Sequence, residues 1–397
     1  MSQAASCVLT AFHDLLALPS DQIDSIGQDT PIPTFSPEIL IDLCEFAIKI
    51  LKNKHCYVEF TSPVYVVGDI HGNIFDLIRI LIYSKLPPTS KYVFLGDYVD
   101  RGEFSVEVCA LLLSLYCTFP NYIVLLRGNH EFMSINGSYG FYDEVKNQYQ
   151  DDYLFRLINS VFNWLPIWAI INHSFFCVHG GISPNLQNLD QIKEISRPCD
   201  TFDDPIIRDL VWSDPSTTCL TFDSSQRGTG VLFGATAIDN FLSRTGLQVI
   251  LRGHQCVLLG ISKFADGKLY TIFSSSRYEE LRNNRAGVLF ISPSNQIELF
   301  SLPPTNIIPR EETNLKLFNG YVQTILSLEK PHTSSLSMNI QLSENKMKNH
   351  SMTRLTRNRK LFTPKVSKLG PASLNNINIS LSEFRSNSSI SFARNII

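Results

Sequence analysis

Five short polar motifs stand out in this sequence, and each follows directly on an apolar run. The motifs occupy residues 68–73, 96–102, 127–131, 179–181 and 252–255. The runs span residues 64–67, 92–95, 122–126, 174–178 and 247–251 and are rich in Val, Ile, Leu, Phe and Tyr. Glycine or a charged residue ends each run, which predicts buried strands. The carboxyl ends of strands in an α/β sheet form the crevice where ligands bind. We therefore expect the five motifs to converge in space.

The motifs carry the side chains that bind metal ions in phosphoryl chemistry. Hard and borderline cations take carboxylate oxygen, amide oxygen and imidazole nitrogen. The candidates are Asp69, His71, Asp97, Asn129, His179 and His254. A carboxylate can bridge two ions roughly 3.5 to 4 Å apart, which is the spacing of a clamp on a phosphoryl displacement. Asp97 is the candidate bridge.

Taken one at a time, these motifs have ordinary explanations. A Gly-Asp pair after a strand is most often a turn, and a single histidine is most often a core or surface residue. Five such motifs in this order indicate a two-metal phosphoesterase site. Asp69 and His71 also lie two residues apart, so an extended segment presents both on one face.

Longer runs accompany the five motifs. They are Ser-Ile-Asn at 134–136, Tyr-Gly-Phe-Tyr-Asp-Glu at 139–144, Leu-Pro-Ile at 165–167, Ile-Ser-Pro at 182–184, Arg-Pro at 197–198, Trp-Ser-Asp-Pro at 212–215, and Arg-Gly at 227–228 before Phe-Gly at 233–234. With these residues the chain resembles the phosphoprotein phosphatase family of metal-dependent serine/threonine phosphatases, most closely its protein phosphatase 1 branch. The resemblance covers most of the chain.

The resemblance implies two divalent ions, manganese first, with iron or zinc as alternatives. One ion would be held by Asp69, His71 and Asp97. The second would be held by Asp97 together with three further ligands, which are Asn129, His179 and His254. A bridging hydroxide would attack phosphoserine or phosphothreonine directly, without a phosphoenzyme.

The resemblance also assigns roles around the ions. His130 would be the general acid, oriented by Asp100. The phosphate would be bound by Arg101, Asn129 and Arg227, with Tyr278 overhanging the site. Three further residues are expected behind the metal and phosphate ligands: Glu131, Asp214 and Arg252. Arg252 is expected to form a structural ion pair.

Two segments depart from the family pattern. Residues 273–280 stand where the pattern has Ser-Ala-Pro-Asn-Tyr-Cys-Gly, and Glu279 takes the place of the cysteine that captures microcystin-type toxins. Residues 256–259, Cys-Val-Leu-Leu, replace an acidic Glu-Asp pair after the last ligand. The second change removes negative charge, which predicts a weaker preference for basic substrates.

The predicted fold is α/β, with four layers in which helices flank a central β-sandwich, the calcineurin-like metallophosphoesterase fold. Helices are predicted over residues 73–84 and 105–116, and closing strands over 269–273, 287–291 and 296–301. Two amino-terminal helices are predicted at 7–18 and 38–52, separated by a proline-rich turn at 30–37. Residues 1–303 are long enough for one catalytic domain.

The carboxy-terminal part has a different composition. From Arg310 onward there are 13 Lys and Arg against 5 Asp and Glu, whereas the preceding chain has 21 against 32. Ser and Asn accumulate there and apolar density falls, so residues 304–397 are predicted to be a disordered basic tail. A solvated extension is one interpretation. The other is that the basic tail binds the acidic catalytic part and regulates it. Thr363-Pro364 would then be a proline-directed phosphorylation site.

The remaining sequence features concern compartment and partners. Nine scattered cysteines without a Cys-x-x-Cys pair, no secretory signal and no membrane-length apolar run predict a cytoplasmic or nuclear enzyme. Phosphoproteins are the expected substrates and regulatory or targeting subunits the expected partners, with nucleic acid disfavoured because aromatic residues are sparse in the tail. Two alternatives stay open: a phosphoesterase acting on nucleotides or other small molecules, and a non-catalytic scaffold that retains the fold.

Overall fold

The computed structural model describes residues 2–279, 283–319 and 353–354, all within the first of two compact units, residues 1–356. Most of the predicted tail, including Thr363 and Pro364, therefore lies outside the described residues. No helix in the described part of the chain is long and apolar enough to cross a membrane.

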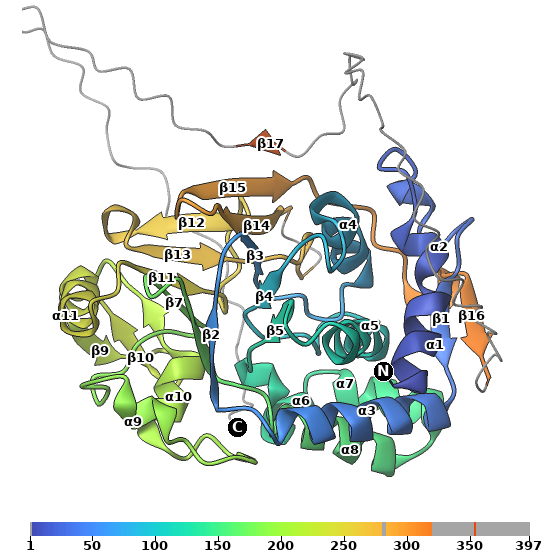
Figure 1. Ribbon diagram of the computed structural model, residues 1–397, viewed down its shortest axis with the longest axis horizontal. Helices are drawn as coiled ribbons and strands as arrows, with labels where there is room; N and C mark the ends of the chain where they lie inside the picture. Colours follow the sequence, from blue (N-terminus) through green and yellow to red (C-terminus); the bar gives the residue numbers. More distant parts are fainter. Residues whose placement is uncertain (1, 280–282, 320–352, 355–397) are drawn as a thin grey trace, which may run out of the picture. The chain divides into compact units, whose positions relative to one another are not determined.

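Two six-stranded sheets form the centre of the structure (Figure 1). The first has the order β12-β13-β11-β7-β6-β2 and the second β17-β15-β14-β3-β4-β5. The strands of the first sheet are β2 (Tyr57–Phe60), β6 (Trp168–Ile171), β7 (Phe175–Val178), β11 (Val249–Arg252), β12 (Ile261–Phe264) and β13 (Leu269–Ile272). Those of the second are β3 (Val64–Val67), β4 (Tyr92–Phe94), β5 (Ile123–Leu125), β14 (Ala286–Ile291), β15 (Ile297–Leu302) and β17 (Thr353–Arg354).

The apolar runs of the sequence are buried because each strand is covered on both faces. In β3, Val64 and Val66 pack in the core between the two sheets, while Tyr65 and Val67 pack against helices. Successive side chains of a strand point to opposite faces, so burial of both faces requires an unbroken apolar run. The predicted strands are confirmed, with ends that differ by one or two residues.

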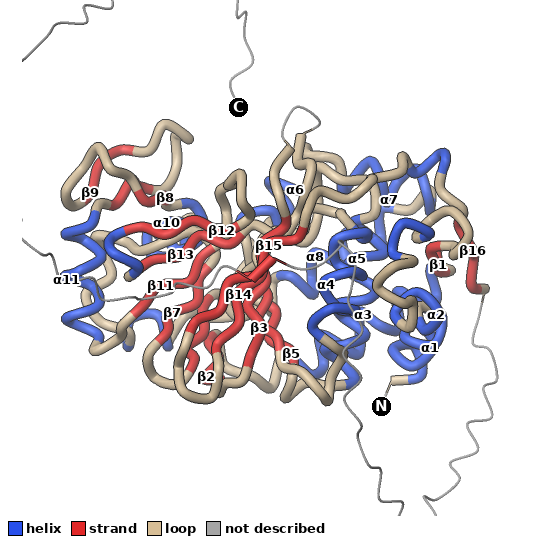
Figure 2. Tube along the Cα trace, turned by 90° about the horizontal axis from the view of Figure 1, so that it is seen from above, coloured by secondary structure: helices blue, strands red, loops and turns tan. Residues whose placement is uncertain are grey.

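Helices cover the outer face of each sheet and complete the four predicted layers (Figure 2). Over the second sheet lie α1 (Gln3–Ala11), α3 (Pro37–Leu51), α4 (Ile74–Ser84), α5 (Ser105–Thr118), α7 (Phe141–Tyr149) and α8 (Asp152–Phe162). Over the first sheet lie α10 (Pro205–Trp212) and α11 (Ala235–Thr245). The shorter elements are α2 (His13–Leu16), α6 (Met133–Asn136), α9 (Asp190–Lys193), β8 (Asp214–Pro215), β9 (Phe222–Ser224), β10 (Val231–Phe233), and 3-10 turns at Ile23–Ser25, Asn129–Glu131, Ala265–Gly267 and Arg310–Glu312.

The proline-rich stretch at 30–37 is not only a turn, because it contains strand β1 (Ile32–Phe35). β1 pairs in parallel with β16 (Leu315–Phe318), and Ile32 and Phe35 are buried. Pro33 is tolerated because a strand of a two-stranded sheet has an edge where no N–H is needed.

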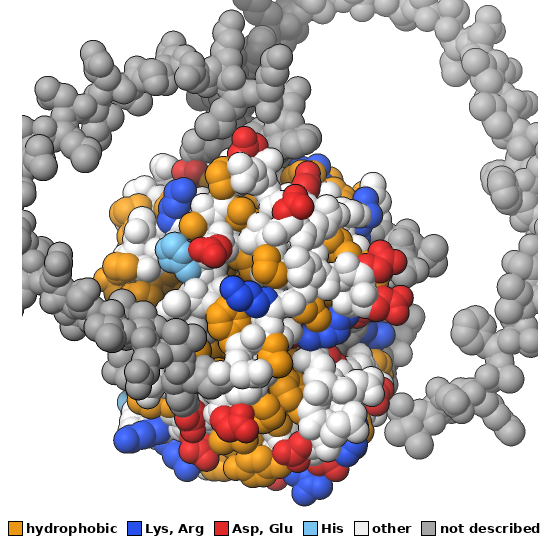
Figure 3. Space-filling model, turned by 90° about the vertical axis from the view of Figure 1, so that its right-hand side faces the viewer, with side chains coloured by type: hydrophobic (Ala, Val, Ile, Leu, Met, Phe, Trp, Pro, Cys, Tyr) orange, Lys and Arg blue, Asp and Glu red, His pale blue; other side chains and the backbone are white. Residues whose placement is uncertain are grey.

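Hydrophobic and charged side chains of both signs are mixed on the face of the molecule that Figure 3 shows.

The described chain packs beyond residue 303, where the sequence predicts the catalytic domain to end, and continues as far as β16. We call residues 303–318 the strap. Thr305 and Ile308 of the strap are buried, and Arg310 binds the two carboxylate oxygens of Glu107 at 2.8 and 2.9 Å. The composition of the strap does not predict its packing, because a few anchoring residues hold it in place and it has no apolar pattern.

Arg310→Ala is expected to lower the free energy of unfolding by about 3 kcal/mol. Glu107 is fully buried in α5, and without the guanidinium its charge loses its partner in a dry environment. Urea unfolding followed by circular dichroism measures the change. Lys316→Ala, which removes an exposed cation from the same strap, is the control and should shift stability by less than about 0.5 kcal/mol. Equal shifts in the two variants would contradict this role of Arg310.

Candidate metal centre

The two sheets bring the five motifs to one place because all five follow the carboxyl ends of strands. Asp69 follows β3, Asp97 follows β4 and Asn129 follows β5 in the second sheet. His179 follows β7 and His254 follows β11 in the first sheet. All six candidate ligands, His71 included, are buried.

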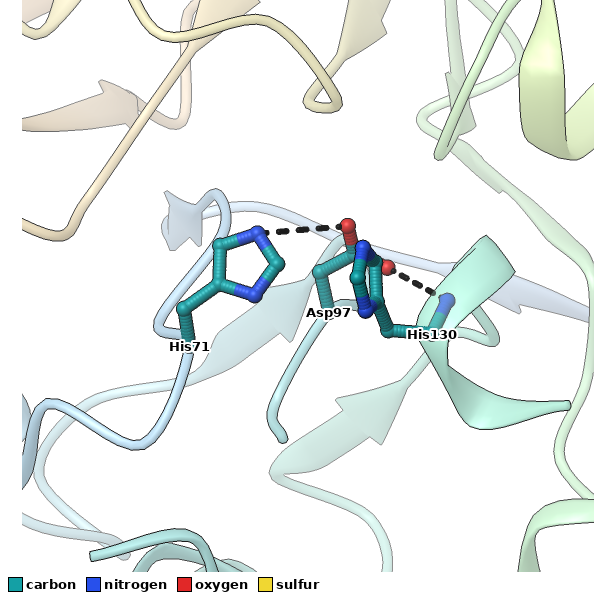
Figure 4. A group of neighbouring side chains, drawn as sticks. All are labelled: His71, Asp97 and His130. Carbon is teal, nitrogen blue, oxygen red and sulfur yellow. Dashed lines mark hydrogen bonds and ion pairs between the residues drawn. The ribbon is translucent and has the colours of Figure 1, made fainter. Parts of the chain in front are cut away.

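Asp97 contacts both His71 and the backbone N–H of His130 (Figure 4). Its Oδ2 atom is 3.5 Å from Nε2 of His71 and 3.3 Å from Nε2 of His179. Its Oδ1 atom accepts a hydrogen bond of 3.0 Å from the backbone N–H of His130. One carboxylate oxygen thus faces both halves of the cluster, as a bridging ligand must.

The first half of the cluster is built from His71, Asp69 and Asp97. Nδ1 of His71 donates to the carbonyl oxygen of Val99 at 3.0 Å, which leaves Nε2 facing the carboxylates. Burial lowers the pKa of His71 to about 3, so Nε2 presents a lone pair. That lone pair faces Oδ2 of Asp69, at 3.8 Å, and Oδ2 of Asp97. Three acceptor atoms facing one another are the arrangement that a cation satisfies.

Oδ2 of Asp69 gives a second indication of a cation. Its partner atom Oδ1 accepts from the backbone N–H of His254 at 2.8 Å, but Oδ2 is buried without a hydrogen-bond partner among the described residues. Burial raises the pKa of Asp69 to about 7. A buried carboxylate oxygen without a donor is costly unless it coordinates a metal ion. The residues therefore fit the metal that the chemistry of the donor set implies.

The second half of the cluster is built around His179. Nδ1 of His179 donates to the carbonyl oxygen of Leu95 at 3.0 Å, so Nε2 turns inward. Nε2 lies 2.8 Å from Oδ1 of Asn129 and 3.2 Å from Nδ1 of His254. In each half, a backbone carbonyl selects the ring nitrogen that is available for a ligand.

His130 lies beside this cluster, and its ring is fixed from behind. Nδ1 of His130 and Oδ2 of Asp100 are 2.6 Å apart, and Oδ1 of Asp100 accepts from the backbone N–H of Phe141 at 2.9 Å. Burial lowers the pKa of His130, but the charge of Asp97 and the hydrogen bond to Asp100 outweigh it, so the pKa is raised. The ring edge that remains faces the cavity.

Glu131 ties the ligand loops together. Its carboxylate accepts from the backbone N–H groups of Asp97, Tyr98 and Gly128 at 2.7 to 2.8 Å. Gly128 is required at this crossing, because a Cβ there would lie 2.2 Å from Oδ1 of Asp97. The predicted position of Glu131 behind the ligands agrees with this geometry.

The backbone of the site is strained at several residues that are predicted to bind metal or phosphate or to take part in catalysis. Non-glycine residues with positive φ include His71, Asp97, Asp100, Arg101 and His254, with φ between 47° and 71°. Each such conformation costs of order 1–3 kcal/mol, and such residues cluster at functional sites. Three of the five are candidate metal ligands, which supports a functional role for this edge of the sheets.

Three arginines surround the cluster in different ways. The Arg101 guanidinium lies over the Tyr139 ring at 4.6 Å, and Nε of Arg227 donates to Oδ2 of Asp214 at 2.6 Å. Arg252 is fully buried and donates to Oδ1 of Asp214 at 2.9 Å. The expected structural ion pair of Arg252 is present, while Arg101 and Arg227 are exposed at the cavity.

A cavity of about 420 Å³ opens onto the cluster. Its lining includes the predicted residues His71, Asp97, Arg101, Asn129, His130, Arg227, His254 and Tyr278. The Tyr278 ring stacks on His71 with centroids 5.1 Å apart. Sequence reasoning did not assign the lining residues Tyr139, Trp212 and Cys256 to the site, although all three belong to segments already noted. A smaller cavity of about 280 Å³ near β2 and β5 contains none of the predicted site residues.

Mn²⁺ is expected to stabilise the fold, since the cluster would bind it and the unfolded chain would not. At a free concentration 100 times its Kd, the stabilisation is about 2.7 kcal/mol. Thermal unfolding with increasing Mn²⁺ measures the rise in Tm. Asp69→Asn, which removes one charge from the first half, should need more Mn²⁺ for the same rise. A Tm that does not depend on Mn²⁺ would contradict a metal centre here.

Comparison with known proteins agrees with this geometry. Residues 62–258 match the family model of the calcineurin-like phosphoesterases. Among solved structures, the chain is similar to a protein serine/threonine phosphatase from Saccharomyces cerevisiae with similarity to human phosphatase PP5. The two share 27% identity with a TM-score of 0.66, over 74% of this chain and 98% of that one.

A cold-active protein-tyrosine phosphatase of a psychrophilic Shewanella species also matches, with 17% identity and a TM-score of 0.48. That match covers 64% of this chain and 82% of the other. The chain thus contains a calcineurin-like metallophosphoesterase domain, and its similarity to the yeast phosphatase is consistent with the phosphoprotein phosphatase family.

Proposed function

We propose that this protein is a phosphoserine/phosphothreonine protein phosphatase that works with two divalent ions. The observation that carries the proposal is the position of Asp97, whose Oδ2 atom faces His71 and His179 at 3.5 and 3.3 Å. The similarity to the yeast serine/threonine phosphatase over 74% of the chain supports a protein substrate.

The donor sets divide around Asp97. Asp69, His71 and Asp97 would hold one ion, with His130 also close to His71 and Asp97. A second ion would be held by Asp97 together with Asn129, His179 and His254. Oxygen and imidazole donors without thiolate suit manganese, iron or zinc. Bound ions of this kind supply an activated water as the nucleophile and stabilise negative charge on the phosphoryl oxygens.

His130 would donate the proton that the leaving seryl or threonyl oxygen needs. Asp100 holds Nδ1 of His130 at 2.6 Å, and this contact orients the ring and favours its protonated form. Because Nδ1 is engaged, Nε2 is the nitrogen that delivers the proton. His130 is therefore the proposed general acid and Asp100 its positioning residue.

Arg101 and Arg227 would bind the phosphate from two sides of the cavity. Tyr139 supports the Arg101 guanidinium through its ring, and Asp214 engages only Nε of Arg227. The terminal nitrogens of Arg227 therefore stay available to phosphate oxygens. Asn129 and Tyr278 complete the proposed phosphate contacts.

We also propose that partner proteins select the substrates of this enzyme, in the cytoplasm or nucleus. The support is the resemblance to a family that works with regulatory subunits, together with the scattered cysteines noted above.

The test of the proposed function compares substrates at fixed Mn²⁺. A phosphothreonine peptide, a phosphotyrosine peptide of the same sequence and a dinucleoside polyphosphate would be assayed for phosphate release. We expect the highest kcat/KM for the phosphothreonine peptide. Preferred hydrolysis of the dinucleoside polyphosphate would instead assign the protein to the small-molecule phosphoesterases.

A further inference from the structure

A second cavity, of about 540 Å³, adjoins the catalytic one. The two cavities share four lining residues, which are His71, Arg101, Tyr278 and Glu279. Its volume lies within the range of roughly 300–1,000 Å³ that ligand pockets occupy. A chain that places a phosphate in the catalytic cavity can therefore continue into this one.

The strap forms one wall of the second cavity and is fixed at both ends of that wall. On one side, the backbone N–H of Thr305 donates to Oγ of Ser276 at 3.2 Å. On the other side, the backbone N–H of Arg310 donates to Glu103 at 2.5 Å, and the Arg310 side chain binds Glu107. The segment between these anchors cannot leave the cavity without breaking one of them.

Alternation along the strap turns two apolar residues toward the cavity. Ile307 and Pro309 line it, whereas Ile308 between them is buried in the core. Ile307 and Pro309 therefore share one face of the strap, as residues two apart do in extended chain. Phe75 of α4 and Phe104, the residue before α5, also line the cavity, although both rings are almost fully buried.

The opposite wall is the loop 275–279, which a buried network holds in place. Oδ2 of Asp76 accepts from the backbone N–H of Ser276 at 2.5 Å and from Nδ2 of Asn73 at 2.7 Å. Nε of Arg79 donates to the other oxygen of Asp76 at 2.5 Å. Both walls are thus fixed before a substrate arrives, which lowers the entropy cost of binding.

The charges that line the second cavity balance one another, so they give little basis for selecting one substrate over another. Its lining contains two arginines and two glutamates. They are Arg101, Arg277, Glu103 and Glu279. Glu103 already accepts from Arg310. The exposed apolar side chains of Ile307 and Pro309 are the feature that distinguishes one substrate side chain from another.

We propose that the second cavity is a substrate subsite that binds an apolar side chain near the phosphorylated residue, with Ile307 as its specificity-determining residue. This inference rests on the proposed function, since its occupant is the flanking chain of a phosphoprotein. The second cavity shares His71, Arg101 and Tyr278 with the catalytic cavity. The chain next to a bound phosphorylated residue is therefore its occupant. The strap thus contributes to substrate choice as well as to stability.

The test uses phosphothreonine peptides in which a single Leu replaces Ser at each of the three positions on either side of the phosphothreonine. Full-length wild-type protein should show kcat/KM about tenfold higher for Leu at one of these positions. Ile307→Asp should reduce that preference to about onefold. p-Nitrophenyl phosphate, which has no flanking chain, should be hydrolysed at the same rate by both proteins, which also shows that the variant is folded.

Leu315→Asp is the matched control, because Leu315 lies on the same strap with the same exposed fraction of 36% but outside the cavity. It should keep the tenfold preference, and Ile307→Ser should reproduce the loss without adding charge. An Ile307→Asp variant with the wild-type preference, or a wild type without any preference, would overturn the subsite alone. Hydrolysis of p-nitrophenyl phosphate without turnover of any phosphothreonine peptide would overturn the proposed function and the subsite with it.

Discussion

Asp97→Asn is expected to lower kcat for a phosphothreonine peptide by about 10³-fold. Oδ2 of Asp97 faces both halves of the metal centre, so its charge contributes to both. Divalent ions supply several kcal/mol of transition-state stabilisation, and roughly 4 kcal/mol corresponds to this factor. Asparagine keeps the shape and the acceptor for the His130 N–H, so the fold should survive.

Steady-state kinetics at saturating Mn²⁺, with thermal unfolding as the check on folding, measures this effect. Asp239→Asn is the control, because Asp239 also forms an ion pair, with Lys268 at 2.6 Å, but on the surface of α11. It should leave kcat unchanged. An Asp97→Asn variant that retains more than about a tenth of wild-type kcat would contradict the shared ligand.

His130→Gln is expected to lower kcat for the same peptide by about 10²- to 10⁴-fold, the usual contribution of a general acid. The loss should depend on the leaving group. A threonine alkoxide needs a proton as it departs, whereas p-nitrophenolate is a stable anion that does not. Hydrolysis of p-nitrophenyl phosphate should therefore fall much less than hydrolysis of the peptide.

Parallel assays of the two substrates make this measurement. His13→Gln provides the control, since His13 is an exposed histidine that also lies beside a carboxylate, Asp14 at 3.2 Å. If His130→Gln lowers both rates by the same factor, His130 acts on the architecture of the site and not as the acid.

The arrangement of the site could be predicted because chemistry and chain order coincide in it. Each ligand follows a strand whose apolar run is visible in the sequence, and strands of one sheet end at a common edge. The local hydrogen bonds that orient the ligands, such as those from His71 to Val99 and from His179 to Leu95, leave no sequence signal. Any residue supplies a backbone carbonyl, so only the structure reveals them.

The strap could not be predicted for a related reason. Its packing depends on Arg310 and Glu107, which are 203 residues apart, and on the pairing of β16 with β1. Neither contact produces a periodic pattern, and the polar composition of the following chain favours the interpretation as a tail. The second cavity could not be predicted either, because Ile307 and Pro309 of the strap form one of its walls.

The most direct test of a two-metal phosphatase centre is a titration of metal-free protein with Mn²⁺ in which bound metal and phosphothreonine-peptide turnover are measured together. Two ions per chain at full turnover is the result that the geometry around Asp97 predicts. Full turnover with a single bound ion, or two bound ions with no phosphoester hydrolysed, would contradict it.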